Sequence, residues 1–248
     1  MKTCIFSPIC QFAQPENDNT LFEEEFNVTE NDRINYRKLF SKTNKNSFVC
    51  GEACPMWNLS ESLLRKNNLL NKNIPAFARR SRMAECRKVL EQAVNNPGYA
   101  LMCIGSNGVN LNELSDLLTY CGICSLWRSA VRRVPIYNLN FSSYLDADRG
   151  SWNINPDSID NDLLFKRNMI NGKSDEGVES NILIISGIDY VNFKDYESSL
   201  LLKIIGTRNS TQFPTLIVGP EPSTLLGTGQ LFSRLTGVLQ EHKVTIKW

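Results

Sequence analysis

Residues 99–114 read YALMCIGSNGVNLNEL, and this stretch decides the fold that the sequence predicts. Its first part is a short apolar run, which predicts a buried strand over residues 100–104. A loop of small residues follows, and then a helix that we expect to end near Gly122, with one face marked by Leu111, Leu114, Leu117 and Leu118. A strand, a small-residue loop and a helix in this order form the setting of a phosphate-binding loop.

The residues that would bind phosphate are missing from this loop. Gly105 keeps the first position of the pattern GxxxxGK[ST], but Asn110 replaces its second glycine. Leu111 stands for the lysine and carries no charge to meet a phosphate, and Asn112 stands for the hydroxyl residue that would hold Mg²⁺. We therefore expect a scaffold that hydrolyses no nucleotide and has no cofactor, although backbone amides at the helix start can hold an anion unaided. The degenerate loop comprises Gly105, Ser106, Asn107, Gly108, Val109, Asn110, Leu111 and Asn112.

Length and charge narrow the class of protein. The chain has 248 residues, enough for one α/β domain and a small appendage. Lys and Arg number 27 against 26 Asp and Glu, and the net charge of +1 creates no overall attraction to nucleic acid or membrane. No apolar run is long enough to cross a bilayer, and the start is too soon interrupted for a secretory signal. We expect a soluble cytoplasmic protein whose eight cysteines are reduced thiols.

Residues 1–56 form a polar N-terminal segment with little periodicity. Its acidic part is Glu23-Glu24-Glu25, flanked by Phe22 and Phe26. Such a tract is either a solvated segment or a docking peptide whose two phenylalanines share one face of a helix. Two readings also remain for the cysteines of this segment, because unlinked thiols and a zinc site both fit Cys4, Cys10, Cys50 and Cys54.

Residues 57–98 predict a helical linker, with a short helix after Asn58 and another over residues 81–95. The second helix and the residues before it are the most basic stretch of the chain. They form either a solvated helix face or a contact with the phosphate backbone of DNA. The residues concerned are Arg79, Arg80, Arg82, Arg87 and Lys88.

Residues 99–248 alternate apolar strands with helical periodicity. We expect further strands at 134–139, 181–188, 213–220 and 244–248, and helices at 163–169, 196–206 and 231–235. This alternation predicts a three-layer α/β domain of the P-loop NTPase type with a mostly parallel sheet.

The strand at 181–188 ends without the acidic pair that a nucleotide hydrolase places there. Ser186 and Gly187 occupy those positions, and Asp189 lies beyond them at the start of a loop. An unusual active enzyme would have to use Asn112 and Asp189, and nucleotide turnover would identify it. Since the lysine, the hydroxyl and the acidic pair are all missing, we expect a protein that is not an enzyme.

The order of these parts resembles the AAA+ domain of DnaC/IstB-type proteins, which are bacterial and phage replicative-helicase loaders and related transposition ATPases. The resemblance covers roughly residues 70–248 and includes the motifs Phe213-Pro214-Thr215 and Ser233-Arg234-Leu235. It places residues 105–112 at the Walker A span, Ser186 and Gly187 at the acidic Walker B positions, and Arg234 at the arginine element.

The resemblance implies an ATPase-dead helicase loader or loader-like adaptor from a phage or another mobile element. Such a protein binds the replicative helicase, oligomerises on it and assists its placement on single-stranded DNA. Because loaders of this family grip the helicase through their N-terminal region, Phe22 and Phe26 are the implied anchors. Two alternatives stay open: an inhibitor or decoy of the host helicase or its loader, and a transposition targeting factor that binds duplex DNA.

Overall fold

The computed structural model describes residues 55–69, 80–105, 109–128, 136–151, 161–174, 177–178 and 181–246. Several residues singled out above therefore lie outside the described residues. They are the two phenylalanines and four cysteines of the N-terminal segment (Phe22, Phe26, Cys4, Cys10, Cys50 and Cys54), the loop residues Ser106, Asn107 and Gly108, Arg79, and the side chain of Arg80.

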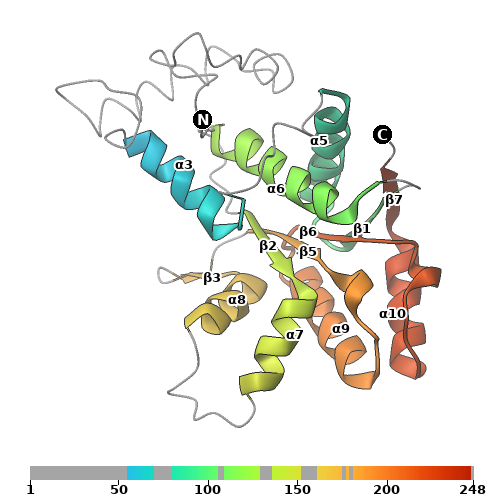
Figure 1. Cartoon of the computed structure of the whole chain (residues 1–248). Coiled ribbons are helices and arrows are strands. Elements are labelled where there is room, and N and C mark those ends of the chain that lie inside the picture. Colours follow the sequence, from blue (N-terminus) through green and yellow to red (C-terminus); the bar gives the residue numbers. More distant parts are fainter. Residues whose placement is uncertain are drawn as a thin grey trace, which may run out of the picture.

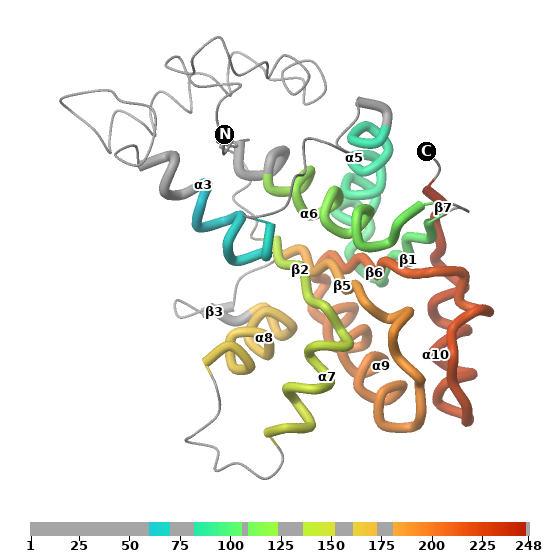
Figure 2. The backbone as a smooth tube through the Cα atoms, viewed as in Figure 1, coloured from blue at the N-terminus to red at the C-terminus, as the bar shows by residue number. Residues whose placement is uncertain are grey.

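The centre of the fold is a five-stranded parallel sheet (Figures 1 and 2). Its strands, from one edge to the other, are β2 (Ile136–Asn140), β5 (Ile182–Ser186), β6 (Thr215–Gly219), β1 (Ala100–Gly105) and β7 (Lys243–Ile246). Strand β1 pairs with β6 in the register Leu101 to Leu216 and with β7 in the register Cys103 to Val244. Every residue of β5 and β6 is buried, which explains the continuous aliphatic runs in the sequence.

Helices cover both faces of the sheet, so the domain has three layers (Figure 1). One face, here called the α6 face, carries α3 (Pro55–Lys66), α5 (Arg80–Asn95) and α6 (Leu111–Arg128). The opposite face, the α9 face, carries α7 (Phe141–Gly150), α8 (Asn161–Asn171), α9 (Asp195–Ser210) and α10 (Gln230–Glu241). A small hairpin of β3 (Lys173–Ser174) and β4 (Gly177–Val178) follows α8. Two 3-10 turns, η4 (Ile188–Tyr190) and η5 (Pro222–Thr224), follow β5 and β6.

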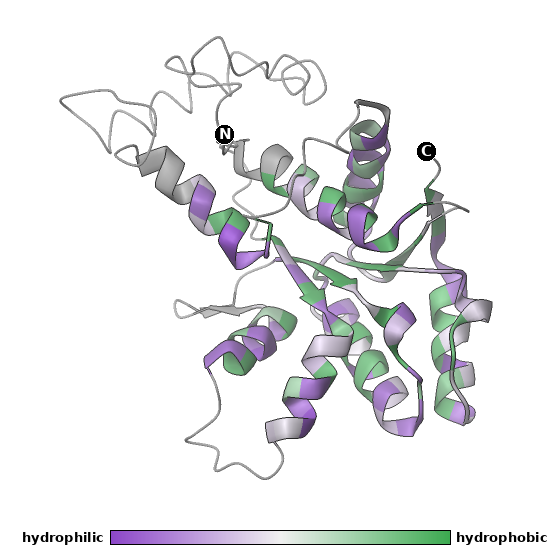
Figure 3. Ribbon diagram, viewed as in Figure 1, coloured by the Kyte–Doolittle hydropathy of each residue, from purple (hydrophilic) through white to green (hydrophobic). Residues whose placement is uncertain are grey.

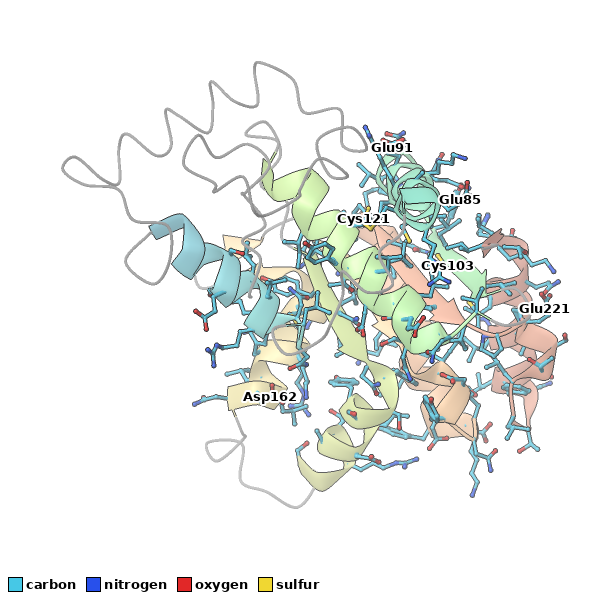
Figure 4. All side chains as sticks on the ribbon, turned by 45° about the horizontal axis from the view of Figure 1, so that its top comes forward. Glu85, Glu91, Cys103, Cys121, Asp162 and Glu221 are labelled. Carbon is cyan, nitrogen blue, oxygen red and sulfur yellow. The ribbon has the colours of Figure 1, made fainter. Side chains whose placement is uncertain are left out.

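Alternation along the strands divides the core into two clusters. On β1, Leu101 and Cys103 belong to the cluster under the α6 face, while Met102 and Ile104 belong to the cluster under the α9 face. In Figure 3 the central strands carry much hydrophobic (green) colour, while the helices carry both green and hydrophilic (purple) residues. Cys103 and Cys121 both lie in the first cluster, between the sheet and its helices (Figure 4).

The order of the strands and the direction of their connections identify this as a P-loop or AAA+-like fold. The chain leaves β1 toward α6 on one face and leaves the neighbouring β6 toward α10 on the other. In open α/β sheets ligands bind where such connections diverge, beyond the carboxyl ends of the strands. The predicted α/β class and the parallel sheet are thus confirmed.

Two local predictions are wrong. Helix α6 does not end near Gly122 but continues to Arg128. The glycine is required by a close approach, because a Cβ there would overlap the Cδ1 of Ile136 on β2. The polar stretch after β2 also contains a helix that the sequence reading missed, α7, which is capped by Asn140 through a 3.0 Å bond from the amide of Ser143.

One buried arginine joins a helix to the amino-terminal ends of two central strands. Arg208, near the end of α9, is fully buried and has no carboxylate partner among the described residues. Its guanidinium donates to Thr215 Oγ1 at 2.7 Å, to Asn181 Oδ1 at 3.0 Å, and to the carbonyls of Asn181, Pro214, Met169 and Ile170. Burial lowers the pKa of Arg208 to about 9. Arg208 therefore holds the starts of β5 and β6 to the end of α8.

Candidate functional site

The degenerate loop lies at the carboxyl end of β1, at the divergence point described above. Its described apolar side chains fold back over the last residue of the strand. A Cβ at Gly105 would lie 2.9 Å from Leu111 Cδ2 and 3.2 Å from Val109 Cβ. Apolar groups therefore pack where a P-loop leaves room for its phosphate-binding backbone.

The backbone amides that begin α6 already have an acceptor within the chain. Asn110 Oδ1 accepts hydrogen bonds from the amides of Asn112, at 2.9 Å, and Glu113, at 3.2 Å. The Asn110 carbonyl accepts from the Leu114 amide at 2.9 Å. Asn110 is therefore the N-cap of the helix, and it occupies donors that would otherwise face an anion. The Glu113 carboxylate in the first turn adds a negative charge to the same place.

The end of β5, where the resemblance places the Walker B positions, holds a neutral hydrogen-bond network. Ser186 Oγ donates to Asn138 Oδ1 at 3.0 Å, across the pair of strands β5 and β2. Asn138 Nδ2 donates to Ser115 Oγ at 2.8 Å and to Thr119 Oγ1 at 3.1 Å, both on α6. The Asn138 amide donates to Asn67 Oδ1 at 3.0 Å, which joins the end of α3 to the edge strand. We call these five residues the Asn138 network.

Gly187, the second Walker B position, has no room for a side chain. Its φ of +73° is in the left-handed region, and a Cβ would lie 2.8 Å from Asn140 Nδ2. Asp189, two residues on, lies in the turn η4, where its side chain is half-buried. The next residue, Tyr190, accepts a 3.4 Å hydrogen bond from Asn112 Nδ2. Asn112 thus contacts the aromatic residue after Asp189.

The end of β6 is filled by apolar atoms as well. A Cβ at Gly219 would lie 2.6 Å from Ile188 Cδ1 and 3.0 Å from Met102 Cε. Arg234, the residue of the arginine element, is exposed on α10. It has no carboxylate within ion-pair distance in the part of the chain that the structure describes.

The described basic side chains of α5 are all in ion pairs. Arg87 pairs with Glu91 at 2.8 Å and Lys88 with Glu85 at 2.7 Å, both along the helix surface (Figure 4). Arg82 lies 3.9 Å from Glu113 at the start of α6. These carboxylates offset the positive charge that a contact with DNA phosphates would use.

Neutral groups therefore stand where a nucleotide hydrolase needs charge. No set of three or more His, Cys, Asp or Glu side chains among the described residues is placed to hold a metal ion. Sequence reasoning identified the loop and the strand end but missed Asn138, which joins that strand end to α6. Its signal was an asparagine between Tyr137 and Leu139 in the expected strand.

Comparisons with known proteins complete this description. No family model matches the chain, and no curated protein matches it. Among solved structures, the crystal structure of the DnaC helicase loader is similar with a TM-score of 0.37 and 13% sequence identity. The alignment covers 64% of this chain and 87% of that one. Within the described part of the chain, no helix is long and apolar enough to cross a membrane.

Proposed function

We propose that this protein is a helicase loader or loader-like adaptor that acts without hydrolysing ATP. The observation that carries the proposal is the combination of a complete P-loop-type sheet with a neutral, internally bonded site. The scaffold that positions a nucleotide is retained, whereas Asn110 caps the amides at the loop and the Asn138 network replaces the acidic pair.

The chemistry of phosphoryl transfer supports the absence of hydrolysis. That reaction depends almost entirely on positioning and on charge that stabilises the transition state, supplied by a lysine and a carboxylate-bound Mg²⁺. Leu111 supplies no charge, and Ser186 and Gly187 supply no carboxylate that could hold a metal ion. We infer that a domain with this neutral site acts by binding other macromolecules.

The partner follows from the family resemblance of the sequence. We propose that the chain binds the replicative helicase of its host, with the N-terminal segment around Phe22 and Phe26 contributing to the grip. Without a hydrolysis step, release of the helicase depends on another event, such as arrival of DNA or primase.

The test is reconstitution with purified proteins. We expect the full chain to elute with the host replicative helicase in the absence of nucleotide, and to increase its loading on a single-stranded DNA circle. We also expect no phosphate release above a no-enzyme blank and no change in loading when ATP is replaced by a non-hydrolysable analogue in the loading step. No complex with the helicase would refute the proposal. A complex that blocks unwinding would instead identify an inhibitor.

A further inference from the structure

A cavity of about 290 Å³ lies between α7, the segment after η4 and the first turn of α9. Its apolar lining comes from Leu145 and Val191, which are both buried. Arg149, Tyr190 and Lys194 also line it. This cavity is separate from the degenerate loop, although Tyr190 contacts Asn112 there.

The guanidinium of Arg149 is fixed by a buried carboxylate and an aromatic ring. It forms an ion pair with Glu197, a carboxylate whose side chain is only 4% exposed. The other oxygen of Glu197 accepts a 2.8 Å hydrogen bond from the Lys194 amide, which fixes the carboxylate to the start of α9. The Cζ of Arg149 also lies 5.6 Å from the centroid of the Tyr196 ring, as in a cation–π contact. The Tyr196 hydroxyl donates a 2.5 Å hydrogen bond to Asp148 Oδ2.

This arrangement leaves donors of Arg149 available to a ligand. The side chain is 46% exposed, and a guanidinium has five N–H donors. Within the described residues, its hydrogen bonding is confined to Glu197. A guanidinium already fixed by a buried carboxylate and an aromatic ring loses little conformational entropy when it binds a second acidic group.

The charges around the cavity do not suit a polyanion such as nucleic acid. Lys194 is exposed and has no carboxylate within ion-pair distance in the described part of the chain. Asp146 also lines the cavity, so its two cations and two acids balance. Nucleic-acid affinity requires several cations against successive phosphates, and a balanced set does not supply them.

Two exposed apolar side chains lie on this surface, Tyr190 at the cavity and Leu226 on a neighbouring loop. Tyr190 is 66% exposed and Leu226 is 68% exposed, among the most exposed large apolar residues described. Their two loops lie side by side, because Phe193 donates to the Leu226 carbonyl at 2.8 Å and accepts from the Thr228 amide at 2.9 Å. A tyrosine and an arginine at a partly apolar pocket are the residue types that contribute most to protein interfaces.

We propose that this cavity docks an acidic side chain of a protein partner, with an apolar residue of the partner resting on Tyr190 and Leu226. Arg149 forms the paired N–H bonds that a carboxylate accepts, and Lys194 supplies a second cation. The inference rests on the proposed function, because the partner it assigns to the cavity is the replicative helicase.

The experiment measures helicase binding by full-length variants. Lys194→Glu and Tyr190→Ser each weaken the complex about tenfold or more, since each removes a central contact of the interface. Arg149→Lys keeps a charge beside Glu197 but loses the paired geometry, and it also weakens the complex. The matched control is Lys203→Glu, an exposed lysine of the same helix that lines a different cavity. It leaves affinity unchanged.

A photo-crosslinker in place of Tyr190 then identifies the partner segment. We expect it to label a helicase peptide containing Asp or Glu, and replacement of that acid by Lys restores binding to Lys194→Glu. Equal affinities of the wild type and all three variants would overturn the docking site while leaving the proposed function standing. A wild-type chain that does not bind helicase would overturn both. Loss of oligo(dT) binding with helicase binding intact would show that the cavity takes phosphate, which also refutes the proposal.

Discussion

Replacement of Asn138 by alanine tests whether the Asn138 network holds the end of β5 to α6. The change removes three side-chain hydrogen bonds, one from Ser186 and two to Ser115 and Thr119. The backbone bond from residue 138 to Asn67 remains available. The hydroxyls of Ser186, Ser115 and Thr119 are buried, so water does not easily replace the lost partner.

The expected loss of unfolding free energy follows from these three bonds. A net contribution of about 0.5–1.5 kcal/mol each gives about 1.5–4.5 kcal/mol in total. For a chain of this size, about 2–4 °C of Tm is lost per kcal/mol, so the transition should fall by about 3–18 °C. Urea unfolding followed by circular dichroism measures the free energy, and differential scanning calorimetry measures the transition.

Two further variants make this result specific. Asn112→Ala is the matched control, because among the described residues the side chain of that exposed asparagine bonds only to Tyr190, at 3.4 Å, and its Tm should stay near that of the wild type. Ser186→Ala combined with Asn138→Ala should cost about 1 kcal/mol less than the sum of the single changes, because the two residues share a bond. An Asn138→Ala protein with wild-type stability, or full additivity in the cycle, would refute the network as a structural link.

The buried groups and the loop give four further predictions. Arg208→Met should lower the unfolding free energy by about 3–5 kcal/mol, since it leaves several buried acceptors unpaired; an unchanged urea midpoint would contradict this. Burial raises the pKa of the Cys103 thiol from 9.0 to about 12, so native Cys103 should resist iodoacetamide at pH 8 and react only in denaturant, as peptide mass spectrometry can show. The same shift removes stability as pH rises from 9 toward 12, because the unfolded thiol loses its proton first, and Cys103→Ala should flatten that part of the stability curve. A loop restored by Asn110→Gly, Leu111→Lys and Asn112→Thr should still release no phosphate, because the end of β5 has no carboxylate; steady turnover would disprove this explanation.

The fold could be predicted to a large extent because its signals are local. Continuous aliphatic runs identified the buried strands β5 and β6, and apolar residues at helical spacing identified α9. The limits of that method show at Gly122, where the sequence pattern predicts a helix end although α6 continues past it and approaches Ile136. They show again at α7, whose apolar residues lie among many polar ones.

The sequence by itself determined the class of domain and showed that residues 105–112 carry no lysine and that the strand at 181–188 ends without an acidic pair, because both depend on residue types at fixed local spacing. Only the tertiary structure decided what the residues at these positions contact. Asn138 bonds to Asn67, 71 positions earlier, and to Ser186, 48 positions later, and no periodicity connects such positions. The fixed guanidinium of Arg149 likewise depends on Glu197 from another helix. Hydrogen bonds of this kind form only when the folded sheet brings distant segments together and excludes water from between them.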